Sequence, residues 1–148
     1  MSRLSFSIER SNNNGPLAVV PRIDGTPLTD LVAAFEGGRH FEPAGAYGGI
    51  IPELFDYGPI DRYFMGEWAE SGGIYVLGCD CGEAGCWPLL CRVKRDGAAI
   101  VWDSFRQPYR AERDYSQFGP FIFDAAQYTA AVELLQAQLT SPSPRRNE

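Results

Sequence analysis

Two segments near the start of the chain predict β-strands, the first because its apolar and polar residues alternate with a period of two. They are residues 4–10 (LSFSIER) and 17–23 (LAVVPRI), and a turn-forming run of Ser, Asn and Gly separates them. Because Pro21 has no backbone N–H to donate to a neighbouring strand, residues 17–23 are expected at a sheet edge or with a bulge.

Two other segments have the apolar spacing of an amphipathic helix, namely residues 27–36 and 125–139. Thr26 is expected to cap the first helix. Asp124 is expected to cap the second, with Gln127 at the reciprocal capping position. The apolar stripes consist of Leu28, Leu31, Val32 and Phe35 in the first helix and of Tyr128, Val132, Leu135 and Leu139 in the second.

Residues 74–105 carry the strongest hairpin signals in the chain. Glycines at 82 and 85 bound one turn, and Asp96 followed by Gly97 marks a second. Three antiparallel strands are therefore predicted. Their apolar faces, together with that of the second helix, predict one buried set: Trp87, Leu89, Val93, Ile100, Trp102, Val132 and Leu135.

These elements predict an α+β fold in which the 74–105 meander is the centre of an antiparallel sheet of about five strands, packed against the two main helices. A chain of 148 residues is long enough to bury a real core. We expect one domain over residues 1–140, with an irregular but packed segment at 37–73 and a disordered tail at 141–148.

Charge and composition limit the classes of function. The chain carries 13 basic and 19 acidic residues, a net charge of −6. This balance argues against nucleic acid and anionic membranes as partners and is compatible with a basic protein partner. The start of the chain lacks the apolar core of a secretory signal, so a cytoplasmic protein is expected.

All four cysteines lie between residues 79 and 91. If Cys81 pairs with Cys86 across the turn, Cys91 lies opposite Val76, because antiparallel partners keep a constant sum of positions. Side chains alternate between the faces of a strand. Cys79, Cys81 and Cys86 are therefore expected on one face, and Cys91 in the core on the other.

Three interpretations of the cysteines follow. The preferred one is structural, with small apolar side chains that fill space near a tight turn and no bound cofactor. A zinc site would use Cys79, Cys81 and Cys86 with His40. Its ligands are normally supplied by C-x₂₋₄-C pairs, whereas the spacing here is C-x-C and then C-x₄-C, and Cys91 points away unless a bulge rotates the strand. A redox function would use a Cys81–Cys86 bridge, but the neighbouring acidic residues disfavour reactive thiolates.

A small-molecule site where the third strand of the meander ends is an alternative interpretation. Trp102, Asp103, Phe105, Arg106 and Tyr109 combine aromatic and charged side chains there. No catalytic residue is assigned, because the chain holds one histidine and no nucleophile or nucleotide-binding motif. Whether the protein is an enzyme stays open, and a binding function is preferred.

Three motifs, C-x-C-G-x-x-G-C-x-P-L from residue 79, V-W-x-x-F-x-Q-P from residue 101 and F-D-x-x-Q-Y from residue 123, give the chain a resemblance. Over roughly residues 45–135 it resembles a group of uncharacterised bacterial proteins with no established activity. The resemblance implies a shared hairpin design that includes Cys79, Cys81, Gly82, Gly85, Cys86, Trp102 and Gln107, and it implies no catalytic residue.

The sequence therefore predicts a small acidic binding or protein-interaction module, of the inhibitor or immunity type. The alternative is a cysteine-based protein, either a thiol oxidoreductase or a structural zinc binder.

Overall fold

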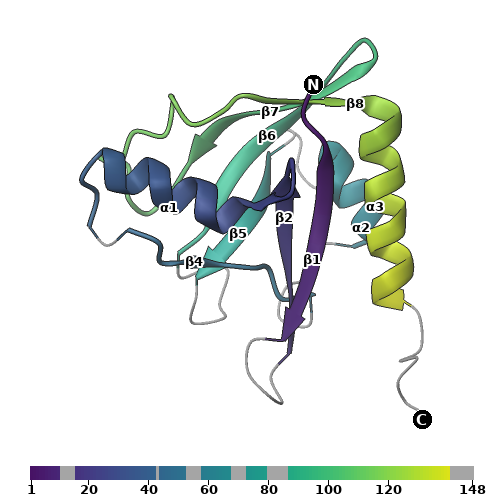
Figure 1. Ribbon diagram of the computed structural model, residues 1–148, viewed down its shortest axis with the longest axis horizontal. Helices are drawn as coiled ribbons and strands as arrows, with labels where there is room; N and C mark the ends of the chain where they lie inside the picture. The colour runs from purple at the N-terminus through teal and green to yellow at the C-terminus, as the bar shows by residue number, and fades with distance from the viewer. Residues whose placement is uncertain (11–15, 43, 53–57, 68–72, 80–86, 141–148) are drawn as a thin grey trace.

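The computed structural model describes residues 1–10, 16–42, 44–52, 58–67, 73–79 and 87–140 of the chain (Figure 1). The expected 141–148 tail and the turn at 82–85 lie outside these residues. The elements, in chain order, are β1 (Leu4–Arg10), β2 (Leu17–Ile23), β3 (Thr26–Pro27), α1 (Leu28–Gly38), β4 (Tyr47–Gly48), α2 (Ile60–Arg62), the π-helical turn η2 (Tyr63–Glu67), β5 (Gly73–Cys79), β6 (Leu89–Asp96), β7 (Ala99–Arg106), β8 (Phe121–Asp124) and α3 (Ala125–Thr140).

The larger sheet has five antiparallel strands in the order β4-β5-β6-β7-β8. The meander β5-β6-β7 is at its centre, which confirms the predicted α+β fold. The edge strands β4 and β8 are short and have no clear alternation in the sequence. All seven residues of the predicted buried set are buried: Trp87, Leu89, Val93, Ile100, Trp102, Val132 and Leu135.

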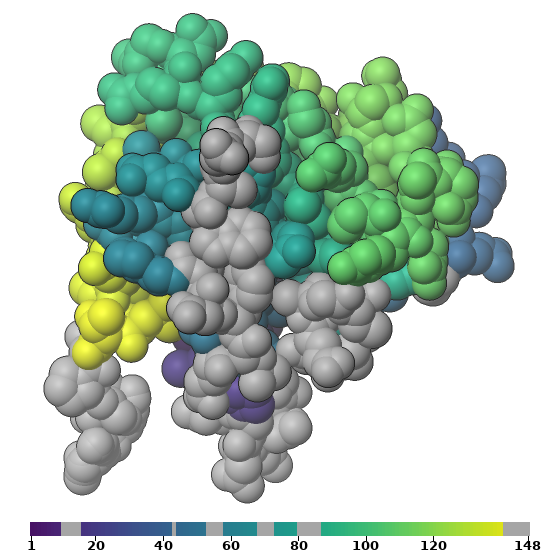
Figure 2. Space-filling model, turned by 180° about the vertical axis from the view of Figure 1, so that it is seen from behind, coloured from purple at the N-terminus to yellow at the C-terminus, as the bar shows by residue number. Residues whose placement is uncertain are grey.

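A second sheet, in the order β1-β2-β3, contains the two strands predicted near the start of the chain. Two isolated bridges join it to the larger sheet, a parallel one between Ser2 and Phe123 and an antiparallel one between Val19 and Ile50. The bridges lie in or next to the two edge strands of the larger sheet, β8 and β4, and the two sheets share one core. Figure 2 shows the molecule from behind, where the β6–β7 hairpin and the segment after β7 form much of the surface.

Pro21 occupies a position that needs no backbone donor. Strand β2 is central in its sheet, whereas the sequence predicted an edge or a bulge. Pro21 lies opposite Phe6, and the neighbour on its other side, β3, pairs only with Arg22 and Ile23. The missing N–H therefore breaks no hydrogen bond of the sheet.

The β5–β6 pairing differs from the predicted register. Cys91 lies opposite Ile74 and not Val76, and a bulge falls between Tyr75 and Leu77. Val76 and Leu77 are both fully buried as a result. The bulge reverses the alternation of side chains beyond this point. Cys79 therefore packs against the core, on the same side of the sheet as Cys91, whereas the sequence predicted the two on different faces.

The turn between β6 and β7 also differs, by one residue. Gly97 and Ala98 form it, since Asp96 pairs with Ala99. Gly97 has a φ of +61°, which glycine adopts without the steric cost that a Cβ imposes. A one-residue shift of the turn changes each cross-strand partner by two positions, which preserves the face of every side chain.

Both main helices were predicted within two residues, but their caps differ. Pro27 and not Thr26 precedes α1, with no side-chain cap. The Asp124 carboxylate accepts a hydrogen bond from the Gln127 backbone N–H at 3.0 Å, as expected for α3. The Gln127 amide does not complete the cap. It accepts from the Leu4 N–H at 2.9 Å and donates to the Leu4 carbonyl at 2.7 Å, which satisfies backbone groups at the free edge of β1.

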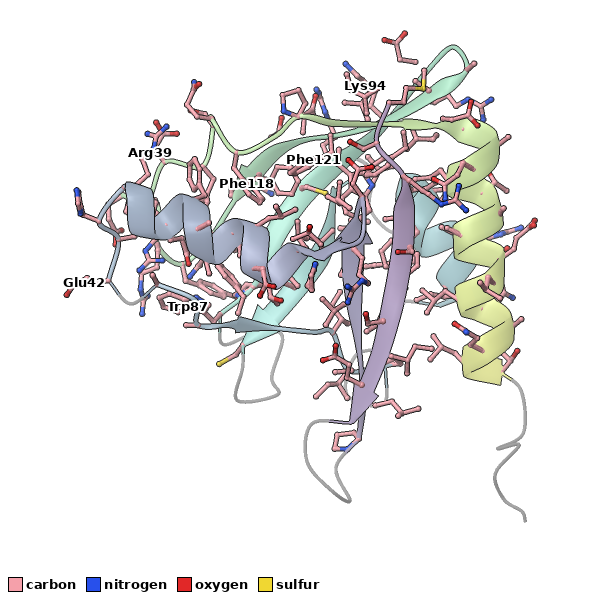
Figure 3. The ribbon with its side chains drawn as sticks, in the orientation of Figure 1. Arg39, Glu42, Trp87, Lys94, Phe118 and Phe121 are labelled. Carbon is pink, nitrogen blue, oxygen red and sulfur yellow. The ribbon has the colours of Figure 1, made fainter. Side chains whose placement is uncertain are left out.

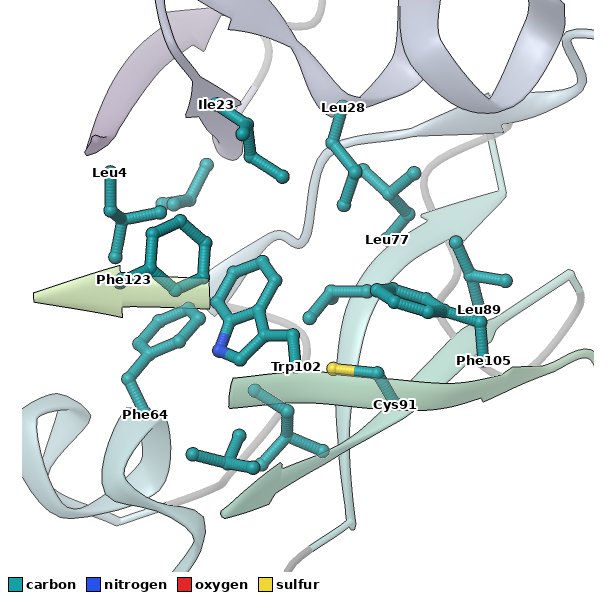
Figure 4. Close-up of a cluster of buried hydrophobic side chains, with 14 of the residues drawn as sticks. Leu4, Ile23, Leu28, Phe64, Leu77, Leu89, Cys91, Trp102, Phe105 and Phe123 are labelled. Atoms are coloured by element: carbon teal, nitrogen blue, oxygen red, sulfur yellow. The ribbon is translucent and has the colours of Figure 1, made fainter. Parts of the chain in front are cut away.

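Trp102 lies in the middle of the core (Figure 4). Its ring centroid is 5.3 Å from the ring centroid of Phe123 and 6.5 Å from that of Phe64. The indole N–H donates to the Tyr128 hydroxyl at 2.9 Å, and that hydroxyl donates in turn to the Phe64 carbonyl. Trp102 therefore connects β7 to α3 and η2.

The described part of the irregular 37–73 segment is packed against the body, as expected, because Tyr47, Ile50, Ile60, Tyr63 and Phe64 are all buried. Among the described helices, none combines the length and apolar character that crossing a membrane requires.

Candidate functional site

A buried carboxylate in α1 organises one end of the molecule. Glu36 follows Leu28 and Val32 at intervals of four residues, so it lies on the helix face that turns toward the core. Its exposed fraction is 0%. Glu36 was not among the predicted site residues, although its spacing from Leu28 and Val32 marks it as an acidic residue that continues a buried stripe.

Three groups from elsewhere in the chain bind this carboxylate. Arg113 Nη1 is 2.7 Å from Oε2, the Tyr115 hydroxyl donates to Oε2 at 2.6 Å, and the Gly45 N–H donates to Oε1 at 2.9 Å. A buried charge needs this degree of pairing to be tolerated. Glu36 thus connects α1 to the loop before β4 and to the loop after β7.

Tyr47 of β4 extends the network, since its hydroxyl is 3.0 Å from that of Tyr115. Burial raises the pKa of both hydroxyls. The hydrogen bond to Tyr115 raises the pKa of Tyr47 further, and the hydrogen bond to Glu36 raises that of Tyr115. Both tyrosines are therefore neutral hydrogen-bonding groups at physiological pH. We call Glu36, Tyr47, Arg113 and Tyr115 the Glu36 cluster.

Trp87 lies against this cluster, two residues before β6 begins. Its ring centroid is 6.1 Å from that of Tyr47 and 5.0 Å from the Arg113 guanidinium carbon. On the solvent side, the guanidinium carbon of Arg110 is 4.7 Å from the same ring centroid. In Figure 3, Trp87 lies beneath α1, at the end of the molecule where Arg39 and Glu42 are also labelled.

The neighbour of Arg110 in the chain, Tyr109, is 57% exposed, which is unusual for a large aromatic side chain. Trp87, Tyr109 and Arg110 together are called the Trp87 surface below. It combines a buried indole with an exposed aromatic ring and an exposed guanidinium group.

Two buried donors near this surface have no hydrogen-bond partner within the described residues, Trp87 Nε1 and Gln107 Nε2. The Gln107 carbonyl oxygen is used, because it accepts from the Tyr109 N–H at 2.8 Å. Buried donors are normally paired, so these two are exceptions within the described part of the chain.

The five residues predicted to form a small-molecule site do not converge. Trp102 and Phe105 belong to the core, where the Phe105 ring is 4.9 Å from that of Phe118. Asp103 and Arg106 lie on the outer face of β7. Tyr109 lies beyond the strand, on the Trp87 surface.

Two of the four cysteines, Cys81 and Cys86, lie outside the described residues. Cys79 is half-buried at the end of β5, opposite Tyr47 of β4. His40 is exposed just after α1, with a φ of +60°. Residues 1–10, 16–42, 44–52, 58–67, 73–79 and 87–140 hold no cluster of three metal-ligating side chains. The zinc and redox interpretations therefore stay hypotheses.

Cys91 should behave as a buried apolar residue. Its exposed fraction is 2%, and burial, with a further contribution from Asp103, raises the pKa of its thiol well above the usual value. We expect iodoacetamide to label Cys79 in the folded protein and leave Cys91 unlabelled at neutral pH, as resolved by peptide mass spectrometry. Equal labelling of both would contradict this placement.

Replacing the same thiol with a hydroxyl should destabilise the fold. Cys91→Ser is expected to lower the free energy of unfolding by about 1–3 kcal/mol, because a hydroxyl would be buried among apolar groups. Cys79→Ser, at a half-buried position, is the matched control and should cost less. Urea unfolding followed by tryptophan fluorescence measures both.

Comparison with known proteins adds nothing to this geometry: no family model, curated protein or solved structure matches the chain.

Proposed function

We propose that the protein is a protein-interaction module that binds its partner through the Trp87 surface. The observation that supports this most is the stacking of the exposed Arg110 on the buried Trp87, next to the exposed Tyr109. Trp, Tyr and Arg are the residue types that contribute most to protein–protein binding energy. The Glu36 cluster beneath them supplies a rigid support, since its polar groups are bound to one another.

The partner we propose is a basic protein, and the module acts as an inhibitor or immunity-type protein in the cytoplasm. The net charge of −6 would accelerate encounter with such a partner. Near the Trp87 surface, the exposed Glu112 and Asp114 accompany the exposed Arg110, while the charge of Arg113 is offset by Glu36. The exposed charges of this loop are therefore more acidic than basic.

Affinity purification of the full-length protein from its native cells, with quantitative mass spectrometry, tests this proposal. The wild-type chain should retain a basic protein that Tyr109→Ala and Arg110→Ala each lose by about tenfold or more, the effect expected for central interface residues. Leu134→Ala, which truncates an exposed apolar side chain of α3, is the matched control and should retain the partner.

Three results would contradict the proposal. One is a partner retained equally by all three variants, which would place the interface elsewhere. The second is a retained partner that is acidic, and the third is the absence of any protein that distinguishes the wild type from Arg110→Ala.

A further inference from the structure

A second bulge, between β6 and β7, forms a pocket on the outer face of the larger sheet. Leu90 pairs with Arg106 but Arg92 pairs with Asp103. Two residues of β7, Ser104 and Phe105, therefore lie opposite the single residue Cys91. The pocket has a volume of about 170 Å³. It is lined by Gly73, Leu90, Cys91, Arg92, Ser104 and Arg106. Because the Cys91 side chain is in the core, Leu90 and Arg92 point to the opposite, outer face.

The charge at this pocket is opposite to that of the whole chain. Arg92 forms two hydrogen bonds with Asp103, from Nε to Oδ1 and from Nη2 to Oδ2, both at 2.9 Å. This pair fixes the Arg92 guanidinium and leaves its Nη1 free for another acceptor. The Arg106 side chain makes no hydrogen bond or ion pair to any residue in the described part of the chain. The pocket lining thus contains two guanidinium groups, and one of them is paired with Asp103.

Ser104 lies in the bulge and lines the pocket. Its φ is +58°, in the left-handed region where a residue with a Cβ is strained and glycine is not. Its side chain hydrogen-bonds to Asp103 and so helps to hold that carboxylate beside Arg92.

We infer that this pocket binds an oxyanion, the carboxylate or phosphate group of a small ligand. Arg106 supplies the principal charge, and Arg92 supplies a second guanidinium that Asp103 orients. Arginine is suited to both anions because its planar fork matches two oxygen atoms. The site lies on the outer face of the sheet and does not depend on the proposed interaction through the Trp87 surface.

Titration of the full chain, followed by two-dimensional NMR of backbone amides, tests the inference. The probes are inorganic phosphate and acetate, each added at constant ionic strength with sodium chloride. We expect saturable shifts at the amides of Ser104 and Arg106 with at least one probe, and the tighter probe identifies which group the pocket prefers. Absence of saturable shifts with both probes would overturn the inference.

Variants separate a built site from a general attraction to positive charge. Arg106→Gln should weaken binding by about tenfold or more, since a hydrogen bond to a charged group is lost. Arg95→Gln removes an exposed arginine of the neighbouring strand β6, whose Nε donates to the Gly97 carbonyl, and it should leave binding unchanged. Equal effects of the two substitutions would show that no specific pocket is involved.

Discussion

Glu36→Ala should lower the free energy of unfolding by about 3–5 kcal/mol, the cost of leaving a buried charge without its partner. The Arg113 side chain is only 5% exposed, and the substitution would also remove the acceptor of the Tyr115 hydroxyl and of the Gly45 N–H. Urea unfolding at several temperatures measures the effect. Should this variant fail to fold, Glu36→Gln, which keeps an acceptor, is the milder substitution and should lose less.

The exposed ion pair of the same protein is the matched control. Arg92 and Asp103 have side chains that are 46% and 22% exposed, so Asp103→Ala should cost about 1 kcal/mol or less. The double variant Glu36→Leu with Arg113→Met should recover much of the stability lost in Glu36→Ala, because it leaves no unpaired charge. Similar losses in Glu36→Ala and Asp103→Ala would contradict the role assigned to the Glu36 cluster.

Trp102→Ala should be comparably damaging, with an expected loss of about 3–5 kcal/mol for a large aromatic side chain removed from a core. Trp102 is fully buried, and its indole N–H is the donor to Tyr128. Trp102→Phe keeps an aromatic ring and loses that hydrogen bond, so it should cost less. Chemical denaturation followed by far-UV circular dichroism measures both, since the substitutions remove a fluorophore.

Ile122→Ala is the control for this series. Ile122 is on the neighbouring strand β8 and is 43% exposed, so its truncation should change stability by about 0.5 kcal/mol or less. A loss for Trp102→Ala no larger than that of Ile122→Ala would contradict the central place of Trp102 in the core. It would then be reasonable to return Trp102 to the set of candidate binding residues.

Local pattern located the buried residues of the meander even where the pairing was wrong. The Asp96–Gly97 turn was misplaced by one residue and the partner of Cys91 by two, yet Ile100, Trp102 and Cys91 are buried as expected. A shift of two positions in the cross-strand partner keeps the alternation of side chains along each strand, and that alternation decides which face of the sheet a side chain occupies. The bulge near Val76 does not conserve it, which is why the position of Cys79 was wrong.

The Glu36 cluster could not be assembled from the sequence. The spacing of Glu36 after Leu28 and Val32 marks it as inward-facing, but Arg113 is 77 residues away and in a loop without periodicity. The same holds for Gln127, whose amide bonds to Leu4 across 123 residues instead of completing a local cap. Such partners depend on how the loops and sheet edges meet.

The sequence by itself determined the fold class, the main helices and strands, and a set of seven buried residues, because helical and strand periods are local properties of the chain. Tertiary structure alone decided which polar groups meet. The stacking of Arg110 on Trp87 and the pairing of Arg92 with Asp103 beside Arg106 both depend on where strands pair, where bulges fall and which loop crosses an end of the sheet. Those choices are made by long-range packing, where a shift of one residue brings different side chains together.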